Sequence, residues 1–242
     1  MTGTLLNIAT VLAGGLIGLA FGARFSDRAR QTILYGMGLF TAAIGVRMFL
    51  ETENPLYPLA GIVIGGLLGE GLGIEDALAR LGAWLEARFS RGEGATTSPF
   101  VRGFLTASLL FCVGPMTILG SIQDGLTGDY QLLAIKSVLD GFAALALAST
   151  LGVGVIFSIV VILVYQGGLT LLASQAQGVL SESMTAEMTA VGGVLLISLA
   201  VSSMLELRPI RTGNLLPALV VSPALVALVV WISGQWSMVG GL

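Results

Sequence analysis

A chain of 242 residues that is 55% hydrophobic and only 10% charged is too apolar for a soluble protein, because soluble domains carry about 25% charged residues. The formal net charge is −3 and no basic tail is present, which argues against nucleic-acid binding. The chain lacks histidine and has one cysteine, Cys112, so no internal disulfide, metal cluster or other cofactor is expected. The composition therefore predicts a single all-α integral membrane domain, residues 1–242, in contact with the lipid bilayer.

A membrane-spanning helix needs about 20 mostly apolar residues, and eight stretches meet or approach that length. The first stretch has no basic residue before it and is longer than the apolar part of a cleaved signal peptide, so we expect it to be retained. The third is short and rich in glycine, and the fifth contains two charges. In chain order the predicted spans are 4–22, 32–50, 57–73, 99–122, 131–149, 151–174, 187–205 and 213–232.

An amphipathic helix is predicted over residues 74–90, between the third and fourth spans. Its apolar residues recur at helical spacing with charged residues between them, which is typical of a helix that lies on a membrane surface. These apolar residues are Ile74, Leu78, Leu81, Trp84 and Leu85. We expect this helix on the cytoplasmic face, followed by a linker over residues 91–99.

The positions of the basic residues predict the orientation of the spans. With eight spans, every lysine and arginine except Arg47 and Lys136 falls on one side of the membrane. Cytoplasmic segments are enriched in these residues, so we expect both termini outside a bacterial inner membrane. Merging or removing one span would destroy this pattern, which therefore also supports the number of spans.

Two parts of the sequence resemble each other. Four residues of segment 36–51 match residues of segment 191–206 at a constant offset: Gly38 with Gly193, Val46 with Val201, Leu50 with Leu205 and Glu51 with Glu206. Spans 1–3 (4–73) would then correspond to spans 6–8 (151–232), with spans 4 and 5 (99–149) between them. The chain changes direction five times from the first span to the sixth, so the repeat would be inverted, as in many secondary transporters. Chance similarity between glycine-rich helices is the alternative.

Lys136 and Asp140 lie inside the fifth predicted span, where ionisable side chains are costly and suggest function. Residues four apart share one face of a helix, so these two can form an ion pair. Two interpretations remain open. The pair either only allows the helix to insert, or forms a coupling site at which protonation or cation binding at Asp140 changes the state of the pair.

The fourth predicted span is interrupted at Gly114 and Pro115. Proline cannot donate a hydrogen bond and frees the carbonyl of Phe111, and a freed carbonyl in lipid needs a partner within protein or a water-filled cavity. An ordinary kink is one interpretation, and a broken helix that lines a substrate path is the other. Four polar residues follow the break: Thr117, Ser121, Gln123 and Asp124.

Asp124 can also be a simple aspartate on the outer surface. Asn7 and Gln166 are weaker candidates, because such residues often serve as hydrogen-bonding contacts between membrane helices. The complete predicted site for a substrate or ion is Asp140, Lys136, Gly114, Pro115, Thr117, Ser121, Gln123, Asp124, Asn7 and Gln166.

Segments 107–125 and 136–141, together with the opening residues 3–7, carry a resemblance to a known family. The chain is similar over nearly its whole length to the bacterial YqgA-like membrane proteins, the family called domain of unknown function 554. Members of that family often carry the description of transport proteins. The resemblance implies that the motifs of the fourth and fifth spans belong together.

The sequence therefore favours a small secondary transporter of an unknown small solute or ion. An ion or small-solute channel is the first alternative, and a scaffold or regulatory subunit without transport is the second. We expect no enzymatic activity, because neither a nucleophile–base pair nor a metal motif is evident. No nucleic-acid partner is expected, and assembly of several copies of the chain is left open.

Overall fold

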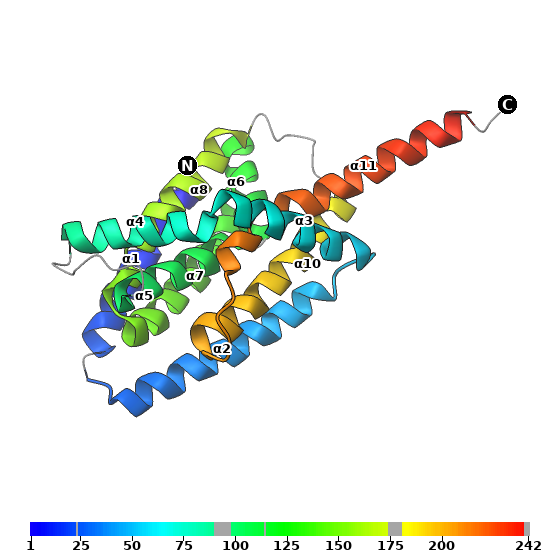
Figure 1. Cartoon of the computed structure of the whole chain (residues 1–242). Coiled ribbons are helices and arrows are strands. Elements are labelled where there is room, and N and C mark those ends of the chain that lie inside the picture. Colours follow the sequence, from blue (N-terminus) through cyan, green and yellow to red (C-terminus); the bar gives the residue numbers. More distant parts are fainter. Residues whose placement is uncertain (23, 90–97, 114, 174–180, 240–242) are drawn as a thin grey trace.

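The structure is a computed structural model that describes residues 1–22, 24–89, 98–113, 115–173 and 181–239, and all regular elements in these ranges are helices (Figure 1). The prediction of an all-α membrane protein is thus confirmed. The elements are α1 (Thr2–Gly22), α2 (Asp27–Phe49), α3 (Leu56–Leu72), α4 (Ile74–Phe89), α5 (Pro99–Cys112), α6 (Pro115–Thr127), α7 (Gln131–Leu151), η1 (Val153–Val155), α8 (Ser158–Leu171), α10 (Glu182–Leu199), the π-helical turn η2 (Ala200–Met204), η3 (Thr212–Leu215) and α11 (Ala218–Val239).

Six helical segments in the described ranges are long and apolar enough to cross a membrane. Two more crossings are possible as pairs of helices that meet at a bend. α3 and α4 meet at 48°, and α5 and α6 meet at 63°. The count is therefore six spans, or up to eight if each bent pair crosses once, and the predicted number is the upper end of this range.

Several helices begin at the residues that helix-capping chemistry favours. Ser26, Ser98 and Ser181 precede α2, α5 and α10, and each hydroxyl accepts a hydrogen bond from a backbone N–H of the first turn. Such caps satisfy N–H groups that have no partner within the helix. α3 ends at Gly73, whose φ of 61° lies in the left-handed region that glycine adopts without strain.

α1 and α7 pack against each other along most of their length and run in the same direction. Three glycines of α1 lie against the backbone carbonyls of three α7 residues in ascending order: Gly14 with Gly141, Gly18 with Leu145 and Gly22 with Ser149. The eight-span arrangement requires this shared direction of its first and fifth spans. α1 and α7 are the first and fifth spans if α5 and α6 together cross the membrane once and α4 does not cross it separately.

Three other pairs of helices pack in opposite directions: α1 with α8, α2 with α10, and α3 with α11. The contacts that define these directions are Thr4–Thr170 and Asn7–Gln166, then Gly45–Gly193 and Thr52–Glu187, then Gly65–Ala218 and Gly69–Asn214. An inverted repeat requires these directions of the corresponding spans. Opposite directions of packed helices do not show that the two units have the same fold, so the inverted repeat stays a prediction.

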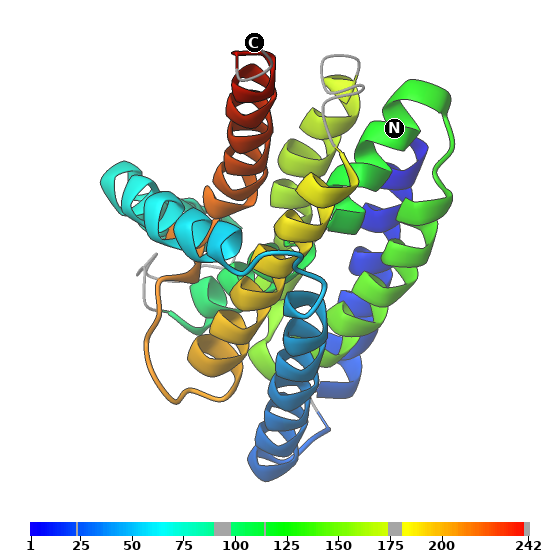
Figure 2. The ribbon, with the colours of Figure 1, turned by 90° about the vertical axis from the view of Figure 1, so that its right-hand side faces the viewer.

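The start of α1 and the end of α11 lie toward the same side of the molecule, as Figure 2 shows. A chain that crosses a membrane an even number of times has this property. Large apolar side chains are exposed along the outer faces of several helices, for example Leu39 and Phe40 on α2 and Leu67 on α3. In a bilayer these faces contact lipid.

α4 forms at the predicted residues, and one face of it packs on α5. Gly82 lies against the ring of Phe104, and Leu85 is 3% exposed. Trp84 does not share this buried face, because it is 60% exposed. The position of α4 on the cytoplasmic surface stays a prediction.

Candidate functional site

The ion pair predicted from the sequence is present near the middle of α7. Lys136 Nζ donates a hydrogen bond to Asp140 Oδ2, and the two residues are 5% and 8% exposed. A single buried charge would be strongly unfavourable, whereas the pair is electrically neutral. Each charge therefore depends on the other.

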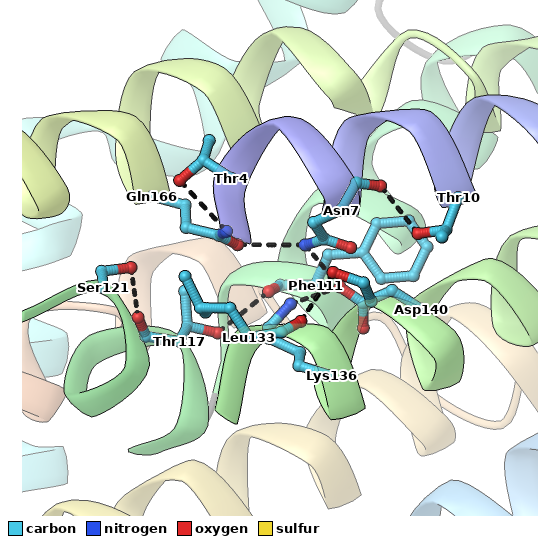
Figure 3. A network of polar contacts seen from close by, with 11 residues as sticks. Thr4, Asn7, Thr10, Phe111, Thr117, Ser121, Leu133, Lys136, Asp140 and Gln166 are labelled. Atoms are coloured by element: carbon cyan, nitrogen blue, oxygen red, sulfur yellow. Dashed lines mark hydrogen bonds and ion pairs between the residues drawn. The ribbon is translucent and has the colours of Figure 1, made fainter. Parts of the chain in front are cut away.

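Asn7 of α1 joins this pair to α8 (Figure 3). Its Nδ2 group donates to Asp140 Oδ2 at 2.9 Å and to Gln166 Oε1 at 3.0 Å. Gln166 Nε2 in turn donates to Thr4 Oγ1 at 3.3 Å. Asn7 and Gln166 are 0% and 1% exposed, so the network lies inside the protein and joins three helices.

The close packing of α1 on α7 positions Asn7. A Cβ atom at Gly14 would collide with the carbonyl oxygen of Gly141, the residue after Asp140. Thr10, one turn before Gly14 on α1, also lies against Gly141. Small residues let membrane helices approach closely, and this approach brings the Asn7 amide within hydrogen-bonding distance of the carboxylate.

The network has hydrogen-bonding capacity that no described residue uses. Asn7 Oδ1 is buried and has no hydrogen-bond partner among the described residues. Both donors to Asp140 reach Oδ2, and within the described ranges no hydrogen bond reaches Oδ1. An ammonium group has three protons to donate, and Lys136 uses one of them on described residues. A buried acceptor without a partner is costly, and a proton, an ion or a water molecule can satisfy it.

The break between α5 and α6 is present, and it satisfies the carbonyl group freed by proline. Thr117 Oγ1 donates to the carbonyl oxygen of Phe111 at 3.2 Å, and Ser121 Oγ donates to the carbonyl of Thr117 at 2.5 Å. The two hydroxyl groups therefore serve the backbone of their own segment and do not donate to Asp140. Pro115 is the first residue of α6, while Gly114 lies outside the described residues.

Asp124 and Gln123 lie outside the network of Asp140. Asp124 is 4% exposed and accepts a hydrogen bond from the backbone N–H of Gly3 at 3.0 Å. It therefore acts as a cap for the start of α1 and is not an aspartate of the outer surface. Gln123 donates to Asp129 at 2.9 Å, so it stabilises the link that follows α6.

Two members of the network were absent from the sequence prediction, Thr4 and Thr170. Their hydroxyl oxygens are 3.4 Å apart, and Thr170 also donates to the carbonyl of Gln166. Thr4 lies one helical turn before Asn7, and Thr170 one turn after Gln166. Both threonines therefore lie on the same helix face as the neighbouring amide, and this spacing of three or four residues is the sequence signal that indicates them.

Comparison with known proteins places the chain among membrane proteins without an assigned activity. A family described as "Protein of unknown function (DUF554)" matches residues 2–227. The chain is 31% identical over 233 residues to the "Uncharacterized membrane protein YdfK" of Bacillus subtilis (strain 168). The matched region covers 95% of this chain and 97% of that protein. It is 30% identical over 229 residues to the "Uncharacterized protein YqgA" of Escherichia coli (strain K12), covering 93% and 96%. No solved structure matches the chain.

Proposed function

Starting from the finding that the chain belongs to the DUF554 family of membrane proteins, we propose that it is a secondary transporter of a small ion or solute that acts through Asp140. The observation that carries this proposal is the buried ion pair of Lys136 and Asp140, held by Asn7, whose own Oδ1 has no partner in the described part of the chain. Apolar residues would stabilise the bundle at least as well as a buried ion pair does. Such a pair at membrane depth is therefore better explained by function than by stability.

Protonation of Asp140, or binding of a cation to it, provides a way to couple occupancy to conformation. A neutralised carboxylate would hold Lys136 and Asn7 less strongly, because charge-assisted hydrogen bonds are about twice as strong as neutral ones. Asn7 contacts both α7 and α8, so weakening its bonds changes contacts among three helices. A ligand that binds two conformations unequally shifts their populations in this way.

The helices that contribute to the network suit a transporter. Asn7 belongs to the first predicted repeat unit and Gln166 to the second, while Asp140 lies on α7 between them in sequence. Transporters with inverted repeats bind substrate and coupling ion where the repeats meet. The proposed site thus combines one side chain from each unit with the ion pair.

The test is ion flux into vesicles that contain the purified protein. A thermal-shift screen of ligands, with and without sodium and across pH, first selects the ion and the solute. Asp140→Asn leaves Lys136 without its counter-ion, so we expect a less stable protein that still folds in the membrane. The folded protein should lose at least about tenfold of the ion-coupled flux, which corresponds to about 1.4 kcal/mol. Asp129→Asn, on the exposed link, is the matched control and should transport normally. Normal transport by Asp140→Asn would make the ion pair structural and the proposal wrong.

The same vesicles separate the proposal from its alternatives. A channel would show unitary currents in electrophysiological recording, whereas a carrier turns over too slowly to show them. The carbonyl of Phe111 already accepts a hydrogen bond from Thr117, which argues against its use in an ion filter of backbone carbonyls. A scaffold would show neither flux nor ligand binding.

A further inference from the structure

The exposed face of α4 carries a tryptophan between two arginines. Arg80, Trp84 and Arg88 are spaced four residues apart, so they lie on successive turns of one helix face. All three are exposed, and Trp84 is 60% exposed. The opposite face of α4 packs on α5, as the contact between Gly82 and Phe104 shows.

The positive charge of this face is not balanced within the described part of the chain. Neither Arg80 nor Arg88 forms an ion pair there, whereas Arg102 pairs with Glu206 and Arg211 with Glu70.

The carboxylates of α4 itself are engaged elsewhere or lie at its start. Glu86 is buried and accepts a hydrogen bond from Ser98, and Glu75 accepts one from the backbone of Gly213. Asp76 lies one turn before Arg80 without an ion pair between them.

We propose that this face binds the headgroup phosphates of anionic phospholipids through Arg80 and Arg88. A guanidinium group presents a planar fork of N–H donors that matches two phosphate oxygens. Trp84 lies between the arginines, and tryptophan prefers the boundary between headgroups and acyl chains. Basic residues next to a membrane are attracted to anionic lipids. The proposal does not depend on whether the protein transports anything.

The apolar side chains beside the arginines favour a lipid over soluble phosphate. Trp84 and Phe89 are 60% and 63% exposed, although the Phe89 ring also contacts that of Phe157. Free phosphate would leave the exposed parts of both rings in water. A phospholipid offers a phosphate to the arginines and acyl chains to the rings at the same time. Its chemistry therefore fits the whole face.

Tryptophan fluorescence tests the proposal on the full chain in vesicles. Trp231→Phe and Trp236→Phe leave Trp84 as the only tryptophan. Its quenching is then compared between vesicles with brominated phosphatidylglycerol and vesicles with the same mole fraction of brominated phosphatidylcholine. We expect stronger quenching by the anionic lipid. Arg80→Gln with Arg88→Gln should remove this preference, because each lost arginine should lower the association constant for the anionic lipid about fivefold.

A matched loss of charge elsewhere is the control. Arg24→Gln with Arg28→Gln removes two exposed arginines outside α4 and should leave the preference intact. Equal quenching by the two lipids before any arginine is changed would overturn the proposal. So would an equal effect of the two double variants, or loss of the preference on adding inorganic phosphate at constant ionic strength. If the Arg80/Arg88 variant does not fold, Arg88→Gln alone should halve the logarithm of the preference for the anionic lipid. An unchanged preference in this single variant would contradict the proposal.

Discussion

Lys136 and Asp140 stabilise each other in a position where neither charge is tolerated alone. Asp140 accepts from Lys136 and from Asn7 on the same oxygen, so the two donors share one acceptor. Removing one partner leaves a buried charge, whereas replacing both by apolar residues leaves no charge beside Asn7. Removing both partners should therefore cost much less stability than removing one.

Lys136→Met should therefore lower the free energy of unfolding by about 3–5 kcal/mol, because it leaves the carboxylate of Asp140 uncompensated. The double variant Lys136→Met with Asp140→Leu should recover most of this loss. Chemical unfolding in detergent micelles, followed by circular dichroism, measures both. A single variant as stable as the double variant would mean that the carboxylate is not charged in the folded protein.

At the level of residues, local pairings were predictable from the sequence and distant ones were not. The spacing of Lys136 and Asp140 is fixed by the helix, and proline fixes which carbonyl is freed. The bond between Asn7 and Asp140 joins residues 133 apart in sequence, and it exists only because α1 packs on α7. The spacing of residues along the chain therefore could not predict the contact between Asn7 and Asp140.

α1 and α7 form the most extensive contact between described helices, and this contact positions the candidate site. The glycines of α1 lie against backbone carbonyls of α7, so a side chain at these positions would force the helices apart. Glycine-rich sequence predicts such close approach in general, but it does not identify the partner helix. The predicted eight-span topology already requires the two helices to be parallel, but their contact appears only in the structure.

Gly14→Ala should destabilise the protein by about 1–3 kcal/mol, the usual cost of overpacking a tight contact. It should also weaken ligand binding at Asp140, since Asn7 moves with α1. The control is Gly36→Ala on α2, where an added Cβ meets nothing within 4 Å. Thermal unfolding of the two variants in the same detergent compares them, and equal midpoints would show that α1 can shift at little cost.

The break between α5 and α6 is an element whose existence could be predicted and whose partners could not. Proline within an apolar stretch indicates a break, and the angle of 63° depends on the helices packed around it. The hydroxyl groups after the break were expected to face a ligand. In the structure Thr117 donates to the carbonyl of Phe111, which is the acceptor that Pro115 frees, and a role of this hydroxyl group at a ligand site stays a prediction.

For the whole molecule, apolar stretches predicted the spans well, since each span is a local property of the sequence. The bends were harder to place, because α3 and α4 are separated by a single glycine and packing decides their angle. The directions of the helices agree with the eight-span topology, and the packed pairs α2–α10 and α3–α11 bring the two predicted repeat units together. An inverted relation between these units predicts that the link after α2 and the link after α10 lie on opposite sides of the membrane.

Cysteine labelling in intact bacteria tests this topology. Cys112→Ala removes the one native thiol, and single cysteines are then placed at Glu51 and Arg208, both exposed. The arginine distribution predicts that the second link is cytoplasmic. A membrane-impermeant maleimide should therefore label the cysteine at 51 in intact cells and the cysteine at 208 only after permeabilisation. Labelling of both from outside would mean that the units share one direction, and the inverted repeat would then be wrong. Labelling of 208 alone from outside would keep the inversion but reverse the predicted orientation of the whole protein.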